Sequence, residues 1–112
     1  MNLTTDHAQG VAIIRVQESR LMYPLLSEFA STVTGLISSG EPKLLLDLST
    51  VTYVDSATIG CLMEIHRLLE DHGGAVKLSG LQRRVSTMLI MTGVHKIVHV
   101  CRDEAEALAA FS

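Results

Sequence analysis

The sequence contains no tryptophan and has only two phenylalanines and two tyrosines among its 112 residues. Proteins that bind single-stranded nucleic acid by base stacking need aromatic faces, so this scarcity disfavours that class. No apolar run approaches the roughly 18 residues that a membrane-spanning helix needs. The first residues also lack the basic stretch and apolar stretch of a signal peptide. We therefore expect neither membrane insertion nor a signal peptide.

Neither basic nor acidic residues are in large excess. The chain has 9 Lys and Arg against 12 Asp and Glu, which gives a formal net charge of −3. A nucleic-acid backbone would be weakly repelled, so we expect no direct nucleic-acid binding. The only two cysteines, Cys61 and Cys101, lie far apart in aliphatic surroundings. We expect both to be reduced and buried, as in a cytoplasmic protein.

Apolar residues, mostly aliphatic, make up 47% of the chain, which is enough for one core. The length predicts one domain spanning residues 1–112. Hydrophobic periodicity and turn residues divide this domain into strands and helices. Strands are expected at Leu3–Thr5, Val11–Val16, Lys43–Leu48, Ala75–Leu78 and Ile97–Val100, and helices at Leu21–Ile37, Ala57–His72, Gln82–Met91 and Glu104–Ala110.

The alternation of strands and helices predicts an α/β fold. We expect a mixed, mostly parallel sheet of four to five strands with about four helices, because parallel neighbours need helical crossovers. The loops that leave parallel strands gather at the carboxyl edge of the sheet, where ligands and partners usually bind. In this chain those loops are Gln17–Tyr23, Ser49–Ser56 and Ser79–Gln82.

Ser56 stands in the second of these loops, directly before the helix expected to be most buried. Its hydroxyl is a suitable N-cap for that helix, because it could accept a hydrogen bond from a free backbone N–H. The same hydroxyl could instead accept a phosphoryl group, whose charge of about −2 is stabilised at a helix N-terminus. The local sequence leaves both interpretations open.

The stretch Leu44–Gly60, LLLDLSTVTYVDSATIG, resembles the motif of anti-sigma factor antagonists. These are the free-standing STAS domains of bacterial partner-switching systems. The resemblance continues through Gly73-Gly74 before an apolar strand and through the segment Met91–Val98. It covers the chain from Val11 to Phe111 and implies a single STAS domain.

The resemblance also implies a function. In this family the antagonist binds an anti-sigma factor that is also a serine kinase, and phosphorylation by that kinase ends the association. Ser56 matches the phosphorylated serine, and a serine phosphatase is a second expected partner. The residues expected to contact the partner are Asp55, Ala57, Thr58 and Ile59 around the helix start and Glu18 and Leu21 in the first loop.

Two segments depart from the family pattern. Thr58 stands where the family usually has glycine, and it is a lesser candidate for modification. The loop Gln17–Tyr23 lacks the usual Gly-Glu-aliphatic-Asp motif, with Leu21 at the Asp position. The identity of the partner therefore does not transfer from the family. An alternative is a STAS domain that is never phosphorylated and acts as a fixed subunit or scaffold, for example of a lipid-transport ATPase complex, with Ser56 only capping its helix.

Enzymatic and metal-binding functions are not expected. No Gly-x-Ser-x-Gly elbow surrounds Ser56, and no glycine-rich phosphate-binding loop is present. His95, His99 and Cys101 straddle a turn and a strand, whereas a ligand pair four residues apart needs one helix face. We therefore predict no catalytic residue, cofactor or metal. Arg83 and Arg84, near a helix start, could meet an acidic partner or a phosphate, or could simply be solvated.

Overall fold

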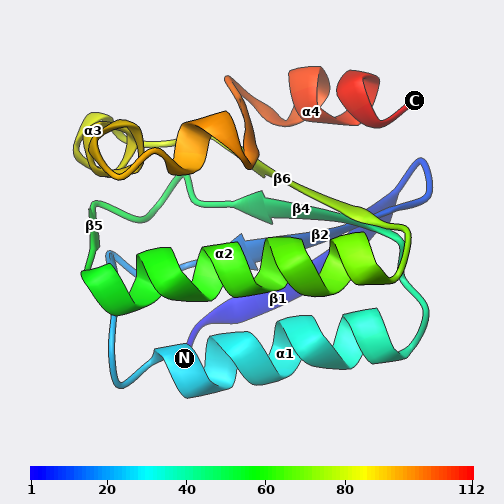
Figure 1. The fold of residues 1–112 in the computed structure, drawn as a ribbon, viewed down its shortest axis with the longest axis horizontal. Coiled ribbons are helices and arrows are strands. Elements are labelled where there is room, and N and C mark those ends of the chain that lie inside the picture. Colours follow the sequence, from blue (N-terminus) through cyan, green and yellow to red (C-terminus); the bar gives the residue numbers. More distant parts are fainter.

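A five-stranded sheet forms the centre of the structure, a computed structural model that describes residues 1–112 (Figure 1). The strand order is β1-β2-β4-β6-β7, and only β1 runs antiparallel to its neighbour. The predicted mixed, mostly parallel sheet is therefore confirmed. The strands are β1 (Leu3–Ala8), β2 (Val11–Val16), β4 (Lys43–Asp47), β6 (Ala75–Ser79) and β7 (His99–Cys101).

Helices cover both faces of this sheet. α1 and α2 lie side by side on one face, and α4 lies on the other (Figure 1). Leu44, Leu45 and Leu46 of β4 are all fully buried, because a central parallel strand is covered on both faces. The helices are α1 (Leu26–Ser38), α2 (Ser56–Asp71), α3 (Arg83–Met91) and α4 (Glu104–Phe111), with a short 3-10 helix η1 (Val94–Lys96).

Two of the predicted elements begin elsewhere. The helix expected from Leu21 starts at Leu26, because Pro24 disfavours helical backbone at the residue before it. Leu21 is fully buried and so continues the apolar spacing of the helix without belonging to it. The strand expected at Ile97–Val100 is β7, which starts at His99 because the 3-10 helix η1 precedes it.

The remaining elements follow the sequence more closely. β1 continues to Ala8, three residues beyond the predicted strand, because it pairs along the whole of β2 in a hairpin. The bounds of β4, β6, α2, α3 and α4 agree with the predicted ones to within one residue. The number of helices, four, also agrees with the sequence.

The structure also bears on membrane spans, the two cysteines and metal binding. None of the helices combines the length and apolar character that crossing a membrane requires. Both cysteines are free thiols whose pKa is raised by burial; Cys101 is buried as expected, but Cys61 is only partly buried, contrary to the expectation for both. No group of three or more His, Cys, Asp or Glu side chains is arranged to hold a metal ion.

Candidate functional site

The three loops at the carboxyl edge of the sheet lie in direct contact, as the sequence predicts. The backbone N–H of Thr52 donates to the Ser19 carbonyl oxygen at 2.8 Å, which joins the loop after β4 to the loop after β2. The Gln82 side-chain amide donates to the Ser49 carbonyl oxygen at 2.7 Å, which joins the loop after β6 to the loop after β4. The edge is therefore one connected surface built from three distant parts of the chain.

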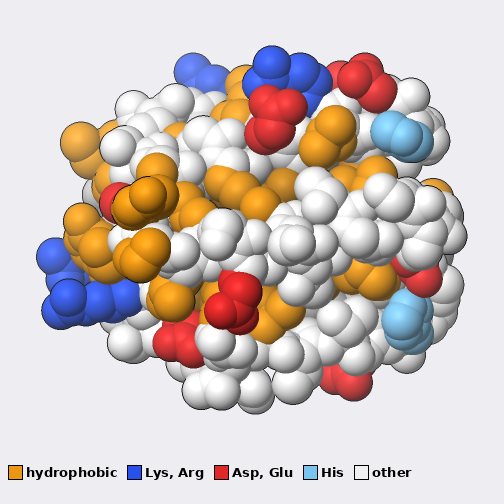
Figure 2. All heavy atoms as spheres, turned by 90° about the horizontal axis from the view of Figure 1, so that it is seen from below, with side chains coloured by type: hydrophobic (Ala, Val, Ile, Leu, Met, Phe, Trp, Pro, Cys, Tyr) orange, Lys and Arg blue, Asp and Glu red, His pale blue; other side chains and the backbone are white.

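Two short strands reinforce this surface. β3 (Arg20–Leu21) pairs in parallel with β5 (Tyr53–Val54) and forms a second, two-stranded sheet. Gly80 crosses close to Ser49 with a positive φ of 73°, and a Cβ atom at Gly80 would lie 3.0 Å from the Ser49 Cβ. Only glycine suits such a crossing. In Figure 2 the left end of the molecule shows hydrophobic and basic side chains next to one another.

Asp55, rather than Ser56, caps α2. The backbone of Asp55 is extended, and its Oδ1 atom accepts a hydrogen bond of 2.9 Å from the Thr58 backbone N–H. Of the two interpretations that the sequence leaves open for Ser56, the N-cap is therefore wrong, because helical backbone already begins at Ser56 and the carboxylate one residue earlier caps the helix. The Ser56 side chain is exposed. Its hydroxyl therefore does not cap the helix.

Thr58 links the start of α2 to the loop after β2. Its side chain is fully buried, and its hydroxyl lies 2.6 Å from the Leu21 carbonyl oxygen and 2.7 Å from Asp55 Oδ1. The single hydroxyl hydrogen is shared between these two acceptors. The backbone N–H of Tyr23 donates to the other Asp55 oxygen, Oδ2, at 3.1 Å. Asp55 and Thr58 together therefore hold the helix start and the loop in one arrangement.

These contacts also fix the charge of Asp55. The hydrogen bond from the Thr58 hydroxyl lowers the pKa of the Asp55 carboxyl. The backbone N–H groups of Thr58 and Tyr23 lower it further and outweigh the opposing effect of desolvation. Asp55 is thus a stable negative charge directly before Ser56 at neutral pH.

The residues expected to contact a partner fall into two groups. Ala57 is exposed, and Asp55, Ile59 and Glu18 are partly buried, so their side chains reach the surface. Leu21 and Thr58 have no exposed side-chain surface. Those two residues position the site, and the expectation that their side chains contact the partner is wrong, because both are buried in the core.

The inward position of Thr58 has a signal in the sequence. The buried residues of α2 recur at intervals of four, three and four positions, which is the spacing of one helix face. Thr58 occupies the first place in this series, so the periodicity alone predicts that it faces the core. The buried residues of the series are Thr58, Leu62, Ile65 and Leu69.

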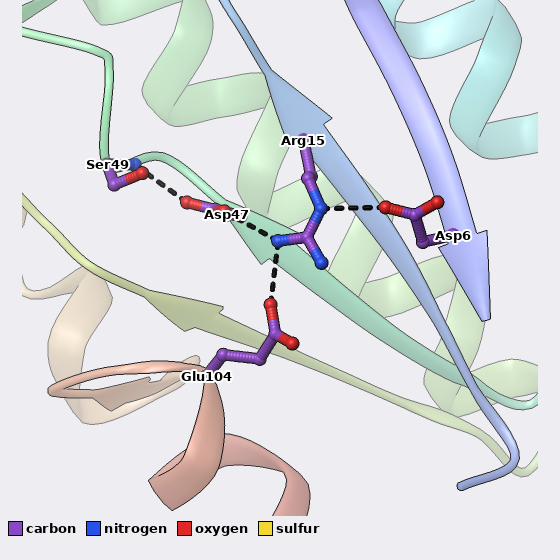
Figure 3. Close-up of polar contacts among 5 residues, drawn as sticks. All are labelled: Asp6, Arg15, Asp47, Ser49 and Glu104. Atoms are coloured by element: carbon purple, nitrogen blue, oxygen red, sulfur yellow. Dashed lines mark hydrogen bonds and ion pairs between the residues drawn. The ribbon is translucent and has the colours of Figure 1, made fainter. Parts of the chain in front are cut away.

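An ion cluster holds the end of β4, from which the loop to Ser56 begins (Figure 3). The Arg15 guanidinium pairs with Asp6 at 2.8 Å, with Asp47 at 3.0 Å and with Glu104 at 2.6 Å. Asp47 is the last residue of β4, and its other oxygen accepts a hydrogen bond of 3.0 Å from the Ser49 N–H. Arg15 therefore connects β1, β2, β4 and α4 through these three carboxylates.

Replacement of Thr58 by valine should destabilise the protein by about 1–3 kcal/mol, because it leaves the buried Leu21 carbonyl without its hydroxyl donor. Urea unfolding would measure this loss. Thr34→Val removes a hydroxyl from an exposed site on α1, where the hydroxyl bonds only to the helix's own carbonyls. This control should change stability by less than about 0.5 kcal/mol. Equal effects of the two substitutions would show that the Thr58 link contributes no particular stability.

Comparison with known proteins identifies the fold that carries this site. Residues 2–107 match the family model of the STAS domain. The chain belongs to the STAS domain family. This agrees with the resemblance found in the segment Leu44–Gly60 and with the arrangement of sheet and helices described above. In this STAS domain, Asp55 and Ser56 lie between the strand pair β3–β5 and the body of α2.

Several relatives of this STAS domain have been named or solved. A Thermotoga neapolitana homologue of the anti-sigma factor antagonist TM1081 is 32% identical over 72 residues, which are 64% of this chain and 64% of that protein. The crystal structure of Thermotoga maritima TM1081 itself matches with a TM-score of 0.88 at 23% identity, over 96% of this chain and 92% of the other. Bacillus SpoIIAA in its phosphorylated form matches with a TM-score of 0.75 at 15% identity, over 99% of this chain and 100% of the other. At these identities the solved structures show a shared fold.

Proposed function

We propose that this STAS domain is an anti-sigma factor antagonist whose binding to an anti-sigma factor with serine kinase activity is ended by phosphorylation of Ser56. The observation that carries the proposal is the exposed Ser56 side chain in the first turn of α2, at the edge where three loops meet. The named relatives support the same class, and one of them, Bacillus SpoIIAA, is described in a phosphorylated form.

The position of Ser56 suits reversible modification. The free N–H groups and the dipole of a helix N-terminus stabilise a phosphate there, so the helix should remain folded after modification. Asp55 already carries a negative charge next to this position. A phosphoserine would therefore concentrate about three negative charges within two residues. A partner packed on the helix start would then have to desolvate that charge, which is unfavourable.

Phosphate incorporation tests this proposal directly. The protein would be incubated with ATP and the proposed anti-sigma factor kinase, and the products analysed by mass spectrometry. We expect one phosphoryl group on the wild-type chain and none on Ser56→Ala. Thr34→Val, which removes an exposed hydroxyl on α1 away from the site, is the matched control and should be phosphorylated as the wild type is. Equal incorporation into wild type and Ser56→Ala would remove Ser56 from the mechanism.

A further inference from the structure

A small pocket lies at the same edge of the sheet as Ser56. It has a volume of about 270 Å³ and is formed by three segments: the loop containing β3, the segment leading into β5, and the start of α3. Figure 2 shows basic and hydrophobic side chains together at this end of the molecule. The lining residues are Arg20, Met22, Thr52, Tyr53 and Arg84.

The arginines at this edge differ from the other arginines of the chain. Three of the six arginines pair with carboxylates within the protein, namely Arg15, Arg67 and Arg102. The other three have no carboxylate within ion-pair distance, although the chain has more acidic than basic residues. All three of these lie on β3 or in the first turn of α3: Arg20, Arg83 and Arg84.

Folding stability does not account for the position of the two charges on α3. The first turn of a helix has a positive partial charge, so cations there are unfavourable and acidic residues are preferred. α3 has no acidic residue in its first turn, and Arg83 and Arg84 occupy that turn instead. The excess positive charge is therefore available to a negatively charged group from outside the chain.

Tyr53 orients one of the two pocket arginines. The Arg84 guanidinium carbon lies 5.7 Å from the centre of the Tyr53 ring, which is within the range of a cation–π contact. A guanidinium held against an aromatic face keeps its N–H groups in a plane that suits a carboxylate or phosphate. Tyr53 is itself fixed by the pairing of β5 with β3, which places it opposite Arg20.

We propose that this pocket binds a carboxylate side chain from an acidic, partly apolar segment of the partner protein, with Arg20 and Arg84 as its ligands. The pocket volume lies at the lower end of the usual range of ligand sites, about 300–1,000 Å³, which suits a single side chain. Tyr23, 72% exposed, and the pocket residue Met22 supply adjacent apolar surface for the rest of the segment. The inference extends the proposed function by giving the chemistry of the partner.

Titration of the ¹⁵N-labelled protein with short peptides tests the pocket by NMR. The probe is acetyl-Leu-Glu-Glu-Leu-amide, and the matched peptide has Gln in place of both Glu residues. We expect saturable shifts at Arg20, Tyr53 and Arg84 with the acidic peptide only. Arg84→Gln should weaken binding about tenfold or more, because it removes a charge-assisted contact. Arg67→Gln, about 16 Å further along α2 from Ser56, should leave binding unchanged.

Three results would overturn the inference. They are equal shifts with the Gln peptide, no saturable shift at the pocket residues, or stronger binding of inorganic phosphate than of the acidic peptide at matched ionic strength. The last result would identify a phosphate site instead. The titration is repeated on Ser56→Ala, so its outcome does not depend on phosphorylation. If the peptide does not bind the pocket but Ser56 is phosphorylated, the proposed function stands and the pocket inference fails. If the peptide binds but Ser56 is not phosphorylated, the pocket inference stands and the proposed function fails.

Discussion

Phosphorylation of Ser56 should weaken binding of the anti-sigma factor by at least about a hundredfold, because burying a poorly compensated dianion costs several kcal/mol and each 1.4 kcal/mol is tenfold in affinity. The Ser56 side chain is exposed and stands next to the ionised Asp55, so the added charge enters a region that is already negative. Isothermal titration calorimetry of the unmodified and the phosphorylated protein against the anti-sigma factor would measure this difference.

Three variants make the affinity measurement specific. Ser56→Ala should bind as the unmodified wild type does, since Asp55 performs the capping and the serine hydroxyl has no structural partner. Ser56→Asp should bind more weakly than Ser38→Asp, which adds the same charge at the other end of the helical layer, on the last residue of α1. If Ser56→Asp and Ser38→Asp bind equally, negative charge at the helix start is not what the partner senses.

Replacement of Arg15 by methionine should destabilise the protein by about 2 kcal/mol at neutral pH, because three carboxylates would lose their common cation. Asp47 matters most among the three, because its side chain is only 19% exposed. Burial alone would raise the pKa of Asp47, but hydrogen bonds from Ser49 and from Arg15 outweigh it and lower the pKa. Urea unfolding would give the change in stability.

The pH dependence provides the check on this cluster. A carboxyl group whose pKa is lowered by folding adds stability above its unfolded pKa and loses that contribution as the pH falls through its folded pKa. The difference in stability between wild type and Arg15→Met should therefore shrink on acidification. Arg102→Met is the matched control, since Arg102 is 82% exposed and its ion pairs of 3.6 and 3.8 Å are long. An Arg15→Met protein as stable as this control would show that the cluster contributes nothing measurable.

The sequence predicts the sheet and the four helices because these elements are long enough to show a hydrophobic period. It does not predict β3 and β5, which are two residues long and exist only because Arg20 and Leu21 pair with Tyr53 and Val54. Such pairing joins segments more than thirty residues apart, and no local pattern records it. The start of α1 is missed for a related reason, since Leu21 fills the core from a strand and not from the helix.

The sequence places Asp55 and Ser56 at the start of a helix but considers only Ser56 as its N-cap, whereas Asp55 is the residue that caps α2. Both Asp55 and Ser56 are good capping residues, so the local sequence cannot decide between them. The contacts of Tyr23 and Thr58 with the Asp55 carboxylate settle the choice, and they come from a loop over thirty residues earlier and from the helix interior. The pocket between Arg20 and Arg84 also depends on tertiary structure, because its lining residues come from three separate segments.

The bonds from Thr58 and Tyr23 to Asp55 have a consequence for the thermodynamics of recognition. Because the loop and the helix start are already joined in the free protein, a partner that docks there has little main chain left to immobilise. Most of its contact energy can then appear as affinity, and the entropic penalty of complex formation should be small. Cutting the Thr58 link would raise that penalty, so Thr58→Val is expected to slow association even though its side chain touches no partner.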